Sequence, residues 1–202
     1  MKFFKENSYD IIKLYITQIG IAIFSFMMYS AVGMINPDST VPIVFSVIVS
    51  VFSTGFFFAL LYCSAWEWGG KDKIRIDAGK MSPHSLKGLK MSLFANVPNF
   101  LFTVLGIISF LFCLFGIDSV FAVIGSICAL IFRFTEMMYQ GIVQAIFQGL
   151  KDGEKNLLFL TVESVAFFAF SLLSALVTHF GYVMGTKEKK LFAFIKNNKK
   201  YE

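Results

Sequence analysis

Long apolar runs dominate this sequence, and one long polar stretch, residues 66–90 (WEWGGKDKIRIDAGKMSPHSLKGLK), interrupts them. Several of the runs are long enough to cross the ~30 Å hydrocarbon core of a bilayer as a helix. Only 15% of the residues are charged and 56% are hydrophobic, whereas soluble domains carry roughly 25% charged residues. A soluble fold of this length could not bury so much apolar surface. The sequence therefore predicts an all-α, polytopic integral membrane helical bundle.

The limits of the apolar runs predict where the spans begin and end. The predicted spans cover residues 14–34, 41–65, 91–115, 119–133, 136–150 and 157–184. They form a single membrane domain over residues 1–202, because no linker is long enough to separate two domains. A basic tail, residues 185–202, follows the last span.

The polar stretch 66–90 predicts the orientation of the bundle, because cytoplasmic loops are enriched in Lys and Arg. Trp66 and Trp68 stand where the preceding apolar run ends, as aromatic residues do at a membrane surface. The stretch is predicted to be a cytoplasmic loop that contacts anionic lipid headgroups or a protein partner. Its candidate contact residues are the two tryptophans with Lys71, Lys73 and Arg75.

Local signals within this loop predict its backbone. Gly69 and Gly70 are expected to end the second helix, and the alternating pattern of residues 73–77 suits a short extended piece. Ser82 and Pro83 are typical of a helix start, so the third helix is expected to begin there.

Residues 120–150 allow two interpretations. No Gly or Pro lies between Ala129 and Gly141, which favours one unbroken helix and a total of five spans. A turn near Arg133 and Glu136 instead keeps the six-Lys tail inside, with sixteen cations inside and only Lys151 and Lys155 outside. The charge bias favours the turn, so both termini are predicted to be cytoplasmic. Six spans are the first expectation, and four spans plus a re-entrant hairpin at 120–150 the second.

A polar series recurs every four residues in the second half of the chain, at Glu136, Gln140, Gln144 and Gln148. On a continuous helix these side chains share one face, and Arg133 pairs with Glu136 at i,i+3. Such a stripe suits a binding site for a small solute, because polar residues at membrane depth usually face a cavity or the bundle interior. The alternative is the wet face of an interfacial helix whose Met138, Ile142 and Ile146 lie in lipid.

Two further groups are candidates for solute contact. Asn96 and Asn99 flank Pro98 within the third span, where a broken helix exposes backbone carbonyls. Glu163 lies two turns into the last span and is a candidate for proton coupling. The structural alternatives are a kink whose amides bond to a neighbouring helix, and a glutamate that reaches headgroups or a neighbouring helix.

Several classes of function lack a recognisable pattern in this sequence. No P-loop, dinucleotide-binding glycine pattern, nucleophile elbow or paired catalytic carboxylates occur, so no enzyme activity and no cofactor is predicted. Cys63, Cys113 and Cys128 fall within apolar runs without ligand spacing, so no metal site is predicted. The net charge of +5 comes from loops and tails, which does not indicate nucleic-acid binding.

These observations predict a multi-pass protein of the cell membrane, and more specifically of a bacterial cytoplasmic membrane. The bilayer itself, with its anionic headgroups, is its predicted partner. The leading hypothesis is small-solute transport, or the membrane subunit of a transporter, with Arg133, Glu136 and the neighbouring polar residues at the solute site. The alternative is a non-transporting accessory or regulatory protein that docks a membrane or cytoplasmic partner through residues 66–90. The sequence leaves open the substrate, the partner and the oligomeric state.

Overall fold

The structure is a computed structural model that describes residues 2–33, 41–82, 84, 86–116, 119–147 and 156–188. The described residues form helices and short connections, with no strand among them, as expected for an all-α protein. The elements in chain order are α1 (Lys2–Gly33), α2 (Val41–Asp77), α3 (Lys87–Ala95), α4 (Val97–Leu114), α5 (Ser119–Thr135), the 3₁₀ turn η1 (Met137–Tyr139), α6 (Gln140–Phe147) and α7 (Asn156–Thr186).

Four helices of the described chain are long and apolar enough to cross a membrane, over Phe3–Ala31, Ile43–Asp77, Val97–Leu114 and Leu157–Thr186. The bent pair of α5 with η1 and α6 raises the number to five if it is a single broken span. The prediction of a membrane protein with several apolar helices is therefore confirmed. Neither α5, with 17 residues, nor α6, with 8, reaches the ~20 residues that a span needs, so the predicted count of six has no support here.

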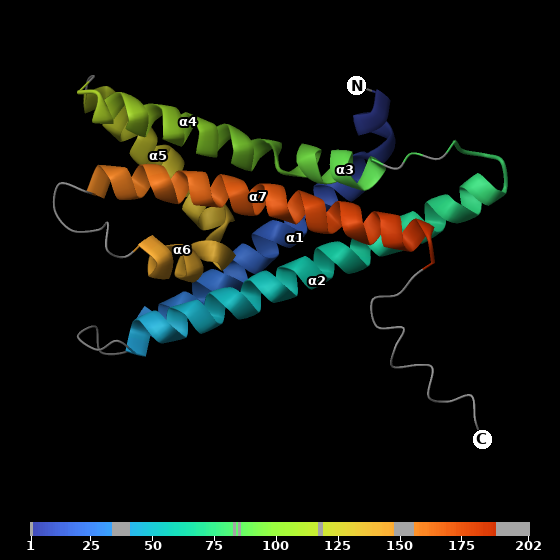
Figure 1. The fold of residues 1–202 in the computed structure, drawn as a ribbon, viewed down its shortest axis with the longest axis horizontal. Helices are drawn as coiled ribbons and strands as arrows, with labels where there is room; N and C mark the ends of the chain where they lie inside the picture. The colour runs from blue at the N-terminus through green and yellow to red at the C-terminus, as the bar shows by residue number, and fades with distance from the viewer. Residues whose placement is uncertain are drawn as a thin grey trace.

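Helix α7 is the central element, because it packs against α2, α3 and α4. In Figure 1, α7 runs between α4 on one side and α2 on the other, with α1 beside α2. The buried core follows this axis and includes Phe57, Phe110, Phe132, Phe167 and Tyr182.

The first residues of α1 and the last residues of α7 lie at the same end of the bundle, where α2 ends and α3 begins (Figure 1). Phe3 of α1 stacks on Phe94 of α3 with ring centroids 6.0 Å apart. Lys73 near the end of α2 forms an ion pair with Glu188, just beyond α7. Because α5 starts and α6 ends at the opposite end (Figure 1), the α5–α6 pair enters the bundle and returns toward the end from which it came.

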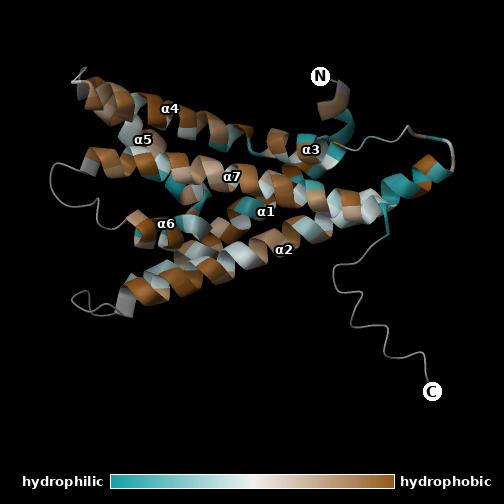
Figure 2. Cartoon of the chain, in the orientation of Figure 1, coloured by the Kyte–Doolittle hydropathy of each residue, from teal (hydrophilic) through white to brown (hydrophobic). Residues whose placement is uncertain are grey.

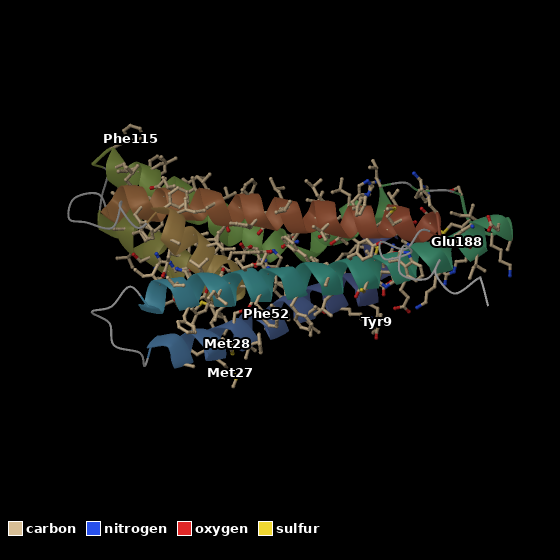
Figure 3. All side chains as sticks on the ribbon, turned by 60° about the horizontal axis from the view of Figure 1, so that its bottom comes forward. Tyr9, Met27, Met28, Phe52, Phe115 and Glu188 are labelled. Atoms are coloured by element: carbon tan, nitrogen blue, oxygen red, sulfur yellow. The ribbon has the colours of Figure 1, made fainter. Side chains whose placement is uncertain are left out.

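The outer surface of the bundle is apolar. Met27 and Phe52 expose more than half of their area, and Phe115 exposes 78%. Figure 3 shows Met27 and Phe115 projecting outward from the ribbons. In Figure 2, hydrophobic colouring covers most of α2, α4 and α7, while the hydrophilic colouring gathers at the end where α2 runs toward α3. An exposed apolar belt of this kind is the surface that a lipid bilayer solvates.

Helix α2 does not end at Gly69 and Gly70 but continues to Asp77, so the predicted helix break and the extended piece at 73–77 are wrong. A Cβ on Gly69 would collide with the Tyr182 carbonyl oxygen of α7, and a Cβ on Gly185 with the Trp66 carbonyl oxygen of α2. The missing side chains therefore let two helix backbones touch, as small residues do between membrane helices. This close contact with α7 stabilises a segment whose intrinsic helix propensity is poor.

The third predicted span is divided at Asn96 into α3 and α4. Pro98 lies in the first turn of α4, where its missing N–H and fixed φ suit a helix start. The prediction that a helix begins at Ser82–Pro83 is wrong, because α3 begins at Lys87, and Pro83 is outside the described residues. Residues 87–90 are helical, as the prediction of a helix leading into the third span expected.

Candidate functional site

The chain bends by 83° at Glu136, between α5 and the segment Met137–Phe147. A break was predicted close to this position from the charge distribution, although no Gly or Pro marks it. Arg133 lies on the last turn of α5 and Gln140 begins α6, so Arg133 does not share a continuous helix with the predicted polar series, of which Gln140 and Gln144 lie together on α6.

Hydroxyl groups of the first two helices bond to the backbone that follows the bend. Ser50 and Thr54 of α2 both donate to the Met138 carbonyl oxygen, at 2.6 and 3.1 Å. The Gly141 N–H donates to the Tyr29 hydroxyl of α1 at 2.7 Å. Irregular backbone is tolerated at membrane depth only when its polar groups are satisfied by protein or water. The apolar helices α1 and α2 therefore carry the hydroxyls that make the bend possible.

Arg133 forms its ion pair with Glu163 of α7 rather than with Glu136, which corrects the predicted i,i+3 pair. The guanidinium Nε lies 3.1 and 3.0 Å from the two carboxylate oxygens, and Nη2 donates to Oε2. Gln140 Nε2 donates to Glu163 Oε1 at 3.1 Å. The Glu163 side chain is fully buried, whereas 35% of the Arg133 side chain is exposed. The pair therefore has one protected face and one open face.

Glu136 occupies the break itself and is completely buried. Its Oε1 accepts a hydrogen bond from the Ser171 hydroxyl of α7. Its Oε2 has no hydrogen-bond partner among the described residues. The hydroxyl of Tyr139 and the amide oxygen of Gln140, both close in sequence, are also buried without a partner there. The bend thus concentrates polar atoms whose hydrogen-bonding capacity is unused.

Asn96 and Asn99 approach the same face of α7 one turn further along. Asn96 Nδ2 donates to the Ser174 hydroxyl at 3.3 Å and to the Ser92 carbonyl at 3.0 Å. Asn99 Nδ2 donates to Asn96 Oδ1 at 3.3 Å. These amides bond between helices, which agrees with the structural alternative of a polar kink. Ser174 in turn donates to the Ser171 carbonyl at 2.7 Å, which connects the asparagines to the Glu136 contact.

The remaining members of the polar series differ in their surroundings. Gln144 is half-buried on α6 and forms no hydrogen bond within the described chain, and Gln148 lies outside the described residues. Met138 is fully buried, so the interfacial-helix alternative, which put Met138 in lipid, is wrong for that residue. Ile146 is 64% exposed, as that alternative expected.

A second polar cluster, the Asp72 cluster, was not predicted. Asp72 of α2 is buried and accepts hydrogen bonds from Lys87 Nζ at 2.7 Å and from the Tyr182 hydroxyl at 2.9 Å. These residues join α2, α3 and α7 at the end of the bundle that holds the start of α1 (Figure 1). No local pattern signals the contact between Asp72 and Tyr182, which are 110 positions apart.

The predicted contact residues for headgroups or partners lie on the last turns of α2. Trp68 is buried and Trp66 is half-buried. The three cations form ion pairs within the chain, Lys71 with Glu67 at 2.6 Å, Lys73 with Glu188 at 2.9 Å and Arg75 with Asp72 at 3.8 Å. Lys71 and Arg75 each keep more than half of their side-chain area exposed.

Within the described ranges no three His, Cys, Asp or Glu side chains gather closely enough to hold a metal ion. The ionisable groups instead form the Asp72 cluster and a second group, the Glu163 cluster, made of Arg133, Gln140 and Glu163. Between them, Ser171 and Ser174 continue the polar face of α7. The sequence signal for that face is the spacing of the polar residues Glu163, Ser171, Ser174 and Thr178, all of which are buried in the structure.

In comparisons with known proteins, no family model, no curated protein and no solved structure matches this chain.

Proposed function

We propose that this protein transports a small polar solute, or is the membrane subunit of a transporter, with its solute site at the bend between α5 and α6. The observation that carries the proposal is the broken helix pair at which a half-exposed Arg133 meets a fully buried Glu163. Broken helices at membrane depth line solute and ion sites in many transporters. Ionisable residues within a bundle usually mark a solute or ion pathway.

The open face of the Glu163 cluster suits a solute that carries hydrogen-bond acceptors. The Glu163 carboxylate occupies the Nε and Nη2 side of Arg133, and the Nη1 nitrogen donates to no group of the described chain. Gln144, one turn beyond Gln140, offers a further amide. A neutralised arginine with a spare donor binds a polar solute without placing a net charge in the membrane.

Topologically, we propose four crossings, by α1, α2, the α3–α4 pair and α7, with the α5–α6 pair as a re-entrant hairpin that enters from outside. Both termini are then cytoplasmic, and this topology keeps fifteen cations inside and only Lys151 and Lys155 outside, with Arg133 at the hairpin tip. A six-span chain would require α5 and α6 each to cross ~30 Å alone. The Lys-rich ends suit the anionic inner face of a bacterial cytoplasmic membrane.

A cysteine-accessibility scan in a Cys-free background tests this topology with single probes at Ser39, Ser82, Ser119, Asn156 and Asn198. We expect Ser39, Ser119 and Asn156 to react with an impermeant reagent from outside, and Ser82 and Asn198 to be protected in sealed cells. Labelling of Asn198 from outside with protection of Asn156 would refute the re-entrant hairpin and leave five spans.

Water access to the solute site is testable without knowing the solute. Thiol reagents need an ionised thiol and therefore water, so Gln144→Cys should react if the site is wet. Leu130→Cys is the matched control, since Leu130 is 72% exposed on α5 yet faces lipid in the proposed topology. Reaction at position 144 without reaction at 130 supports the site, and protection of both contradicts it.

The solute itself can be sought by ligand-induced stabilisation, because a ligand that binds the native state raises the unfolding temperature. The panel comprises amino acids, short carboxylic acids, sugars and inorganic phosphate. A solute of this site should stabilise the wild type but not the double variant Arg133→Gln/Glu163→Gln, which removes both charges together. Arg75→Gln, at the distant end of α2, is the matched control and should keep the effect. Uptake of the same solute into proteoliposomes then tests transport.

The alternative proposal is an accessory protein that docks a partner on the end of α2. One observation favours it, since Ile74 is 70% exposed between the exposed Lys71 and Arg75. A basic face with an apolar residue at its centre suits an acidic protein surface. Reversing the charges of Lys71, Lys73 and Arg75 should abolish co-purification of such a partner, while the same reversal should leave solute-induced stabilisation unchanged.

A further inference from the structure

We propose that Glu136 is a proton-binding site, whose carboxyl group is the neutral acid in this conformation and exchanges its proton with water. The proposal deepens the proposed transport function and rests on it only for the role of the proton as coupling ion. It assigns to Glu136 the proton coupling that the sequence suggested for Glu163.

Among the described residues, the elements around Glu136 supply no cation that is free to neutralise its carboxylate. In α1 and α2 the charged residues are confined to 2–13 and 67–77, at the far end of the bundle, and α4 and α6 contain none. Arg133 is already bound to Glu163. The titratable groups that face the bend from the elements packed there are Arg133 of α5, Tyr139 of η1, Tyr29 of α1 and Glu163 of α7, with His179 two turns beyond Ser171.

Hydrogen bonding at the break also fits the neutral form. Ser171 donates to Oε1, which is the role of the carbonyl oxygen in a carboxylic acid. Asn96 donates to the Ser174 hydroxyl and Ser174 donates to the Ser171 carbonyl, so these donors are directed elsewhere. No described group donates to Oε2. An ionised carboxylate without a cation and with a single hydrogen bond is very costly in a bundle interior, and such a group takes up a proton instead.

Glu163 provides the contrast within the same site. It is equally buried, but it accepts three hydrogen bonds from Arg133 and one from Gln140, so a cation and an amide satisfy its oxygens. Glu136 at the bend and Glu163 on α7 thus differ in their partners, since only Glu163 has a cation. Ser171 is eight residues beyond Glu163, which sets the Glu136 contact roughly 12 Å deeper along α7 at ~1.5 Å per residue.

The chemistry is a reversible protonation. A proton from water adds to Oε2 of the Glu136 carboxylate and gives the neutral acid, and release returns it to water and restores the charge. Neutralisation makes the interior of the bundle electroneutral, because Arg133 and Glu163 already cancel. Proton uptake and solute binding at the adjacent open face of Arg133 are then linked through one bend.

Infrared spectroscopy of the purified full chain tests the proposal directly. The C=O stretch of a protonated carboxylic acid should be present in the wild type near neutral pH and should disappear reversibly at high pH. Glu136→Gln, which keeps the shape and the Ser171 contact, should lose this band. The matched control Arg133→Gln/Glu163→Gln should retain it. Absence of the band from the wild type, or its persistence in Glu136→Gln, overturns the proposal.

Thermal unfolding against pH gives a second readout. In the folded bundle, ionising Glu136 opposes burial, so the stabilising proton is present at low pH and lost as pH rises. The unfolding temperature of the wild type should therefore fall as pH rises above about 4.3, where a glutamate of the unfolded chain ionises, and that fall should be smaller in Glu136→Gln. Identical pH profiles contradict the proposal.

A sodium titration separates a proton from a metal cation. The infrared band should not change when sodium is added at constant pH, and its loss would overturn the proposal in favour of a sodium site. The outcomes are distinguishable from those of the transport proposal. A protonated Glu136 in a protein with no wet, solute-binding Arg133 site would refute transport alone, whereas an ionised Glu136 beside a working solute site would refute the proton site alone.

Discussion

The Asp72 cluster and the Glu163 cluster both neutralise a buried carboxylate at a contact with α7, but in different surroundings. Asp72, near the end of α2, is held by Lys87, the first residue of α3, and by Tyr182 within α7, and the Lys87 side chain is only 11% exposed. Glu163 is held by Arg133 and Gln140, which lie on the two sides of a break in the chain, and Arg133 is 35% exposed. One cluster is a closed junction of three helices, and the other stands at a bend in the chain and has an open face.

This difference teaches what a buried ion pair does in such a bundle. At the Asp72 end, three helices meet through one carboxylate that also sits beside the close backbone contact of Gly69 and Gly185. Because both the carboxylate contacts and the close backbone contact hold these helices together, this end suits a rigid structural junction. At the Glu163 end the charge pair is the main polar link between α5 and α7, and a rearrangement of the bend would change it. Functional bistability is therefore expected at the Glu163 cluster and not at the Asp72 cluster.

The largest expected effect comes from Arg133→Gln. This change leaves Glu163 fully buried with only Gln140 as a partner, and an uncompensated buried charge costs about 3 to 5 kcal/mol. Denaturant unfolding in mixed micelles measures the loss. Arg133→Gln/Glu163→Gln should recover most of it, because no charge is left unpaired. Failure of the double variant to recover would show that Arg133 acts through packing.

The next effect tests the close approach of α2 and α7. Gly185→Ala places a methyl group against the Trp66 carbonyl, and since backbone atoms cannot move aside alone, we expect a loss of about 3 kcal/mol, the upper end of the usual overpacking range. Gly70→Ala is the matched control, because a Cβ at Gly70 meets no atom within 4 Å. It should be neutral or stabilising, by up to about 1 kcal/mol of helix propensity.

The glycines also show where sequence reasoning reached its limit. The apolar runs predicted the membrane helices, because hydropathy and length act locally. Gly69 and Gly70 were interpreted as a helix break by the same local logic, but α7 overrides their low propensity through a contact more than 110 positions away. Gly181 and Gly185, four residues apart on α7, were the available signal, since both contact backbone of α2.

The candidate site was predictable in its position but not in its pairing. Cation counting indicated a turn near Arg133 and Glu136, because insertion energetics depend on which loops carry Lys and Arg. The i,i+3 rule then paired these two residues on a helix that in fact ends at Thr135. Ser171, the actual partner of Glu136, has no distinguishing local pattern, since serine is common where membrane helices pack.

A smaller effect is expected at the Asp72 cluster. Lys87→Gln removes the main cation, but Asp72 keeps the Tyr182 hydroxyl, and Arg75 stays 3.8 Å away. We expect a loss of about 1.5 kcal/mol, the lower limit for a hydrogen bond to a charged group, measured by the same micelle unfolding. A loss equal to that of Arg133→Gln would show that the two clusters are not different in kind.

The smallest effect is expected for Lys71→Ala, on the exposed face of α2. Lys71 pairs with Glu67 at 2.6 Å, but both side chains expose more than half of their area, and solvent-exposed pairs of this kind contribute little. The purified variant should unfold like the wild type. The same comparison in native membranes sharpens the contrast, because a partner docked on Lys71, Ile74 and Arg75 would stabilise the wild type there and not the variant. Equal stability in both settings leaves the bend at Glu136 as the functional region, whereas a loss confined to native membranes shifts the function toward the end of α2.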